Sequence, residues 1–310
     1  MIFDSLLSKA FGKAMGRGDG LPSLRYFPLS YFQVASKPFS FVSEGRLLRG
    51  EACFPAVEPK AVIVFFHGLG AGYTSYSPEI ASMVKAGYLV YCFDYTGCMQ
   101  SEGSSMVDLG HPILDIRAFF SFLDGEEIAK GKARFALGHS WGGYMALHSL
   151  YDEKYGISRS VSLAGFIDLA GIVEHTAPNM SKLDGALRHY FRKRYGAAAG
   201  QSATTFLKEA TGKRLLYIAS PNDDMVPYKD NFIPLRDSLG GKEGFEFICL
   251  PNKGHQPYWS DDAVAYFRDI MAKARPSHLD RDVSIGIDFA RLQQDDEKVI
   301  KTIIDFFSRG

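Results

Sequence analysis

One serine of the chain lies in a sequence context that suits nucleophilic catalysis. Residues 138–142 read Gly-His-Ser-Trp-Gly, between an apolar run and a helical pattern. Gly-x-Ser-x-Gly at such a junction is typical of a nucleophile elbow, a strained turn that exposes the serine hydroxyl above a sheet. The helix that follows points its N-terminal amides at the same place, where they stabilise developing negative charge. We therefore expect Ser140 to be a nucleophile rather than an incidental turn residue.

A serine hydroxyl needs a base to take its proton and a carboxylate to hold that base in the correct tautomer. His255 follows one strand-like run, and Asp223 and Asp224 follow another. The carboxyl ends of parallel strands meet at one edge of an open α/β sheet, so these loops are expected to converge on Ser140. The spacing leaves both aspartates open as the partner of His255.

Two backbone amides must also bind the oxyanion of a tetrahedral intermediate. We expect these to be the amide of Trp141, directly after the serine, and that of Leu69 in the loop 67–70. This loop lacks the Gly-Lys-Ser/Thr ending of a phosphate-binding loop. No Cys-x-x-Cys pair is present among the four cysteines. We therefore expect neither a cofactor nor a metal ion.

The elements that position these residues are visible as alternating patterns. A hairpin over 39–43 and 46–54 precedes short apolar runs of the kind that buried parallel strands need. The runs cover 61–66, 89–93, 134–137, 160–163, 215–219 and 245–250. Helical spacing separates them at 77–86, 112–123, 141–150 and 229–239. The alternation predicts an α/β fold with a mostly parallel, doubly wound sheet and an antiparallel N-terminal hairpin.

One interval departs from this alternation. Residues 166–213 contain helical patterns but no strand-like run, so we expect a helical cap inserted into a core of 39–165 and 214–310. Its apolar residues either pack the cap onto the core or line a pocket, and Phe166 and Tyr190 are the candidates for substrate contact. Residues 1–38 are expected to form an N-terminal extension, and they are poorly periodic. Their Arg-Gly-Asp tripeptide, 17–19, is expected to arise by chance.

The composition excludes several classes of protein. The 310 residues include 35 Lys and Arg and 35 Asp and Glu, with 46% hydrophobic residues. A balanced charge gives no electrostatic basis for binding nucleic acid or an acidic membrane surface. No apolar run approaches the 18 residues of a membrane span, and residues 1–20 do not read as a secretory signal. We expect a cytoplasmic protein that acts on a small molecule; its oligomeric state stays open.

Together these motifs resemble the α/β-hydrolase superfamily, and within it the serine hydrolases related to monoglyceride lipases and serine aminopeptidases. The resemblance runs from about residue 39 to 274, over the motifs at 67–70, 94–103, 138–142, 223–227 and 254–255. It implies that Asp223 rather than Asp224 orients His255, because relatives commonly read Asp-x-x-Val-Pro here. Met99 stands where relatives often have glycine, in a loop that usually borders the site.

The resemblance implies a cofactor-independent hydrolase that cleaves a carboxylic ester through an acyl-enzyme on Ser140. His67, Cys98 and Met99 would then lie near the substrate. Amide or peptide hydrolysis is the alternative, and free N-terminal specificity would call for a carboxylate such as Glu174 or Asp184. Thioesters and lysophospholipids are also open. A non-catalytic binding protein on the same fold is the competing class.

Overall fold

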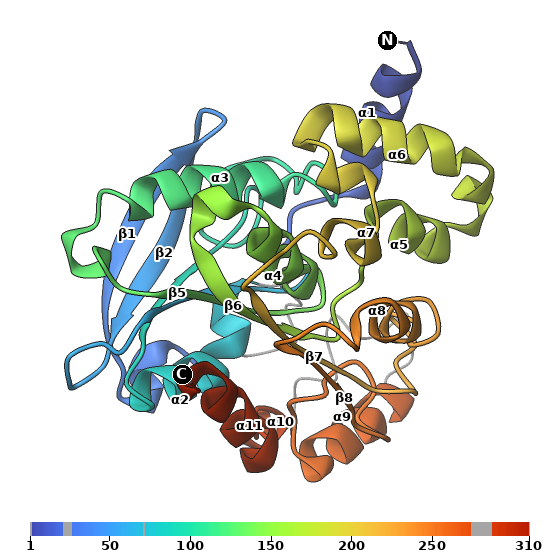
Figure 1. Cartoon of the computed structure of the whole chain (residues 1–310). Coiled ribbons are helices and arrows are strands. Elements are labelled where there is room, and N and C mark those ends of the chain that lie inside the picture. The colour runs from blue at the N-terminus through green and yellow to red at the C-terminus, as the bar shows by residue number, and fades with distance from the viewer. Residues whose placement is uncertain (1, 21–26, 71, 274–286, 310) are drawn as a thin grey trace.

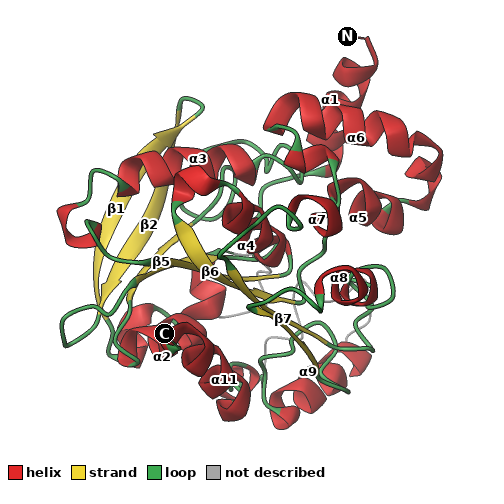
Figure 2. Cartoon of the chain, in the orientation of Figure 1, coloured by secondary structure: helices red, strands yellow, loops and turns green. Residues whose placement is uncertain are grey.

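The centre of the molecule is an eight-stranded sheet. The structure is a computed structural model that describes residues 2–20, 27–70, 72–273 and 287–309. The strand order is β1-β2-β4-β3-β5-β6-β7-β8. The strands are β1 (Ala35–Ser43), β2 (Arg46–Phe54), β3 (Val62–Phe66), β4 (Leu89–Phe93), β5 (Arg134–His139), β6 (Ile157–Leu163), β7 (Arg214–Ala219) and β8 (Phe245–Cys249). The pairs β1–β2 and β2–β4 are antiparallel, and the other neighbours are parallel. The predicted fold class is confirmed (Figure 2).

Helices cover both faces of this sheet (Figure 1). The helices of the described chain are α1 (Ile2–Ala14), α2 (Ser77–Lys85), α3 (Pro112–Leu123), α4 (Trp141–Tyr151), α5 (Leu169–Thr176), α6 (Asp184–Tyr195), α7 (Ala203–Phe206), α8 (Phe232–Leu239), α9 (Asp261–Lys273), α10 (Phe289–Leu292) and α11 (Glu297–Ser308), and not all of them contact the sheet. Consecutive residues of β3 point into two different cores: Val64 packs with the α3 and α4 side, and Ile63 with the α2 and α11 side. Every residue of β3 and β4 is buried, as a strand covered on both faces requires.

The chain between β6 and β7 contains α5, α6 and α7 and, in its described residues, no strand. These helices lie together at the right of the sheet, on the side opposite α2 and α11 (Figure 1). Leu187 and Phe191 of α6 are buried in the same core cluster as α4. The helical segment 166–213 therefore packs directly over the helix that follows Ser140.

The N-terminal residues are ordered against this helical segment, which their weak periodicity did not predict. Leu7 and Phe11, four residues apart on α1, are buried, and the Phe11 ring lies 5.6 Å from that of Tyr190. The following residues reach the loop after β4, where Arg17 donates to the backbone oxygen of Met99 (2.7 Å). Arg17 also pairs with Asp19 (2.9 Å), so two residues of the Arg-Gly-Asp tripeptide hold an internal contact.

The C-terminal residues return to the sheet through α9, α10 and α11. The sequence predicts two amphipathic helices, at 260–274 and 290–308, around an irregular link at 275–289, and most of that link lies outside the described residues. Val299 and Ile303 of α11 are buried in the core on the α2 side. Among the described residues, no helix combines the length and the apolar character needed to cross a membrane.

Two buried carboxyl groups join α2 to the segment before α11. Glu79 and Asp295 interact directly, and burial raises the pKa of both above their ordinary values. The pKa of Asp295 reaches about 7, against 3.8 in water, so the pair holds a proton where an unfolded chain would be ionised. Such a pair stabilises the folded chain fully below pH 3.8, and this stabilisation is lost as the pH rises through about 7.

Glu79→Gln is expected to reduce this pH dependence, because the amide keeps the shape and a donor but does not ionise. The difference in melting temperature, variant minus wild type, should increase from pH 5 to pH 9. Circular dichroism measures both melting temperatures. Glu127→Gln is the control, since Glu127 is 84% exposed and its curve should run parallel to that of the wild type. If the melting temperature of Glu79→Gln followed the same pH dependence as that of the wild type, the proton shared by Glu79 and Asp295 would be contradicted.

Candidate active site

Ser140 lies at the turn between β5 and α4 with a backbone that L-residues rarely adopt. Its φ is 56° and its ψ is −115°. Its N–H donates to the backbone oxygen of Leu163 on β6 (2.8 Å), and its own carbonyl accepts from Tyr144 (3.1 Å). Close backbone approaches surround it: a Cβ at Gly138 would meet the carbonyl of Gly142, and one at Gly142 that of Phe66. The two glycines of the pentapeptide are therefore required by space.

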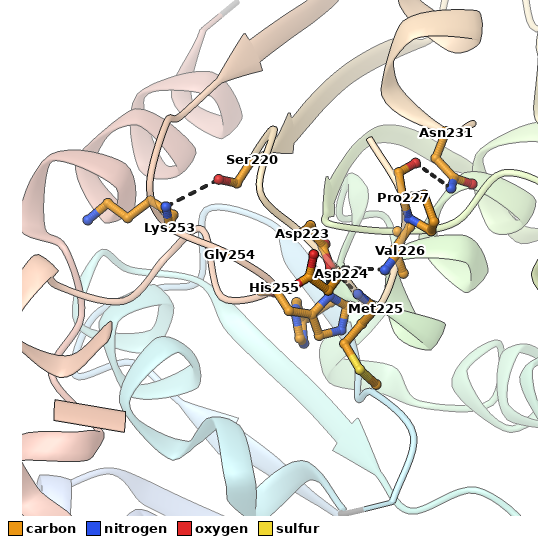
Figure 3. A network of polar contacts seen from close by, with 12 residues as sticks. Ser220, Asp223, Asp224, Met225, Val226, Pro227, Asn231, Lys253, Gly254 and His255 are labelled. Atoms are coloured by element: carbon orange, nitrogen blue, oxygen red, sulfur yellow. Dashed lines mark hydrogen bonds and ion pairs between the residues drawn. The ribbon is translucent and has the colours of Figure 1, made fainter. Parts of the chain in front are cut away.

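His255 and Asp223 meet at the carboxyl ends of β8 and β7 (Figure 3). The His255 Nδ1 lies 2.9 Å from Asp223 Oδ2 and 3.1 Å from Oδ1. Asp223 is buried, and its Oδ1 also accepts from the backbone N–H groups of Met225 and Val226, both at 2.9 Å. With Asp223 as the acceptor, His255 donates through Nδ1, and its Nε2 is left to accept. The carboxylate of Asp224 is exposed, and its backbone oxygen faces His175.

The loops that carry this pair are tied to each other. Ser220 at the end of β7 accepts from the backbone N–H of Lys253 (3.2 Å) and donates to the side chain of Asn222 (2.6 Å). The same Asn222 oxygen accepts from Gly254, the residue before His255 (3.4 Å). Figure 3 shows Ser220 and Lys253 bridging the two strand ends. The separation of Asp223 and His255 is thus set by the loops and not only by their own contact.

His139, the second residue of the pentapeptide, positions its neighbours instead of serving as a base. Burial lowers its pKa well below 6.5, and the nearby His255 lowers it further, so the ring is neutral. Its Nε2 donates to the backbone oxygen of His255 (2.7 Å), and its Nδ1 accepts from the Tyr76 hydroxyl (2.9 Å). That hydroxyl in turn accepts from the N–H of Gly68 (3.1 Å). One buried ring therefore connects the His255 loop to the loop that contains Leu69.

The two residues expected to donate to the oxyanion, Leu69 and Trp141, line the same cavity as Ser140. The N–H groups of Leu69 and Trp141 donate to no backbone or side-chain acceptor in the described part of the chain. His67 fixes the shape of the Leu69 loop: its Nε2 accepts from Tyr95 N–H (3.1 Å), so its Nδ1 carries the proton and donates to the oxygen of Gly68 (2.7 Å). An amide left without an internal acceptor beside a serine is available to an oxyanion.

Ser140 and His255 open into a cavity of about 500 Å³, the size of a small-molecule site. Leu69 and Trp141 line it as well. Among the described lining residues there is no Asp, Glu, Lys or Arg. The surface around Ser140 and His255 is therefore mostly apolar, and its polar lining residues, such as Ser75 and Gln256, are uncharged.

The structure brings only part of the expected pocket to this cavity. Phe166 lines it, stacked on Tyr144 (ring centroids 4.9 Å apart). His67, Cys98, Met99 and Tyr190 are not among its described lining residues, so this cavity does not support their predicted contact with the substrate.

Each of these four residues makes other contacts. His67 is buried, and its ring contacts the backbone oxygen of Gly68. Cys98 is buried where Gly18 pairs with it, and the neighbouring Met99 is bound through its carbonyl by the N-terminal segment. The hydroxyl of Tyr190 donates to the buried carboxylate of Asp108 (2.8 Å).

Several lining residues were not identified from the sequence. Met15 reaches the cavity from the N-terminal segment, and Met225 borders it beside Asp223. Trp259, Phe267, Phe289 and Leu292 line it from α9, α10 and the loop before them. A signal was available only for Trp259, an aromatic residue four positions after the histidine. The others depend on how both chain ends fold back onto the sheet.

The sheet order and the serine elbow define a member of the α/β-hydrolase superfamily. Residues 57–222, just over half of the chain, match the family described as serine aminopeptidase, S33, and the chain belongs to that family. The matched region contains residues 138–142 and the loop 67–70 and ends one residue before Asp223. No curated protein is similar in sequence to the chain.

Solved structures with the same fold include several hydrolases. An esterase from Pyrococcus furiosus has a TM-score of 0.64 and 17% identity, covering 95% of this chain and 97% of its own. An acylaminoacyl peptidase from Pyrococcus horikoshii has a TM-score of 0.56 and 19% identity, over 89% of this chain and 42% of that one. Est1E from Butyrivibrio proteoclasticus, solved with ferulic acid, has a TM-score of 0.55 and 14% identity, over 76% and 98%. Identities this low establish the fold alone.

Replacing each neighbouring aspartate separately tests which one orients His255. Asp223→Asn keeps an acceptor for the Met225 and Val226 amides but disfavours the Nδ1-protonated tautomer of His255, so kcat for an ester should fall by a factor on the order of 10³–10⁴. Asp224→Asn is the matched control and should stay within about twofold of the wild type. Equal rates for the two variants would contradict the proposed role of Asp223.

Proposed function

We propose that this protein is a serine hydrolase that cleaves carboxylic esters with an apolar acyl or alcohol group. The observation that carries the proposal is the juxtaposition of Ser140 and the Asp223-paired His255 in an apolar cavity with no charged Asp, Glu, Lys or Arg among its described lining residues. A neutral ester with an apolar group can enter such a cavity without leaving a buried charge unpaired.

The reaction proceeds in two halves. Ser140 Oγ attacks the ester carbonyl carbon while His255 Nε2 takes the hydroxyl proton, and Asp223 stabilises the imidazolium through Nδ1. The amides of Leu69 and Trp141 bind the oxyanion, and the start of α4 adds its dipole. The ester bond breaks, the alcohol leaves with the proton from His255, and an acyl-enzyme remains. Water then attacks the acyl carbon by the same route and releases the acid and Ser140. The reaction as proposed requires no cofactor.

The apolar lining also favours an ester over the substrate of an aminopeptidase. A free N-terminal ammonium group bound next to the scissile amide needs a carboxylate for its charge. The two candidates from the sequence lie elsewhere: Glu174 borders a separate cavity, and Asp184 pairs with Arg188 (2.7 Å). Neither lines the cavity that contains Ser140.

Parallel rate measurements on p-nitrophenyl esters and aminoacyl p-nitroanilides test this choice. We expect the esters to be turned over with the higher kcat/KM, and Ser140→Ala to lower kcat by a factor on the order of 10⁶ because the nucleophile is lost. Ser75→Ala is the control, since Ser75 lines the same cavity without a proposed role. Faster hydrolysis of an anilide with a free amino group would overturn the ester proposal, and unchanged turnover by Ser140→Ala would overturn the mechanism.

A further inference from the structure

One side of the cavity is built by residues beyond the region that defines the family. Phe289 and Leu292 belong to α10, and Trp259 and Phe267 belong to α9 and the loop before it. All four side chains are apolar and line the cavity that contains Ser140. They lie outside residues 57–222, so this wall is a feature of the chain's own C-terminal part.

The short helix α10 is held firmly against α9. The Arg291 guanidinium forms two hydrogen bonds with the Asp262 carboxylate, both at 2.6 Å, and lies 4.4 Å from the centre of the Tyr266 ring. The hydroxyl of Tyr266 accepts from the backbone N–H of Asp288 (2.8 Å). Because Phe289 and Leu292 flank this anchor, their side chains have a defined position in the wall.

The same wall is tied to the His255 loop through a buried lysine. Lys253 Nζ contacts Asp296 and Asp261, both at 2.7 Å, and donates to the backbone oxygen of Trp259 (2.8 Å). The backbone N–H of Asp296 donates to the oxygen of Tyr258 (2.7 Å). The wall and the loop that contains His255 are therefore joined by one set of contacts.

From these contacts we propose that α10, with Trp259 and Phe267, forms a subsite for the alkyl chain of the substrate, and that Phe289 limits the length of chain accepted. The inference deepens the proposed ester hydrolysis and rests on it. Each methylene group buried against such a wall should raise kcat/KM about fourfold until the chain meets Phe289. The alkyl chain belongs either to the acid or to the alcohol of the ester, and the test treats the two separately.

The kinetic test compares wild type, Phe289→Ala and Phe289→Trp on two ester series. One series is p-nitrophenyl esters from acetate to decanoate, and the other is acetate esters of alcohols from butanol to decanol. In the series whose chain enters the subsite, the length at which kcat/KM stops rising should increase for Phe289→Ala and decrease for Phe289→Trp. Met271→Ala is the control, because Met271 lies on α9, is 44% exposed and does not line the cavity.

A binding test keeps the subsite separate from the chemistry. Both tryptophans of the chain, Trp141 and Trp259, line the cavity, so intrinsic fluorescence reports on its contents. Titration of Ser140→Ala with 1-alkanols should give affinities that rise about fourfold per methylene, and adding Phe289→Ala should change the affinity for decanol but not for butanol.

The outcomes are distinguishable. Absence of ester hydrolysis with length-dependent alkanol binding that responds to Phe289 would overturn the proposed function and leave the subsite supported. Ester hydrolysis with length profiles that Phe289→Ala and Phe289→Trp share with wild type would overturn the subsite alone. Phe289 is only partly buried, so Phe289→Ala is expected to fold even where the larger tryptophan is not accommodated.

Discussion

The strained backbone of Ser140 is the constraint on which the rest of the structure depends. A φ of 56° outside glycine costs on the order of 1–3 kcal/mol and persists only where neighbouring structure enforces it. Here the bond from Ser140 N–H to Leu163 fixes the turn to β6, and the first turn of α4 continues from it. Glycine at 138 and 142 lets the backbones of β5, α4 and β3 come closer than a Cβ at either position would permit. The strain holds the hydroxyl at the edge of the sheet, in the cavity.

The proposed partners of Ser140 are arranged with reference to that turn. β7 and β8 lie successively beyond β6, so their loops open on the same edge and bring Asp223 and His255 together. His139, directly before Ser140, donates from its neutral ring to the backbone oxygen of His255. The position of His255 thus depends on a contact between the pentapeptide 138–142 and the histidine loop, as well as on the Asp223 carboxylate.

The central fold and the polar residues of the site were predictable because their signals are local. β3 and β4 are short, wholly apolar runs, which only strands covered on both faces need. The Gly-x-Ser-x-Gly turn and the Gly-His loop can each be recognised from a few consecutive residues. The resemblance favoured Asp223 over Asp224, and in the structure Asp223 is the one that contacts His255.

The apolar lining could not be predicted in the same way, because it depends on tertiary contacts between distant segments. Helix α1 buries only Leu7 and Phe11 of its described side chains, too few for a recognisable period, and it packs on α6. The residues after α1 also contact the loop that was expected to border the site, where Arg17 donates to the backbone oxygen of Met99. At the C-terminal end, Phe289 lines the cavity from a helix that the Arg291–Asp262 pair attaches to α9. That pair joins residues 29 positions apart in the sequence.

The most direct test of the account is the site of covalent modification by a fluorophosphonate, located by peptide mass. These reagents phosphonylate a serine only where a base and an oxyanion site activate it. The account predicts one adduct, on the peptide that contains Ser140, which is lost in Ser140→Ala and slowed in His255→Ala. An adduct on another residue, or none on a folded protein that hydrolyses esters, would contradict Ser140 as the nucleophile.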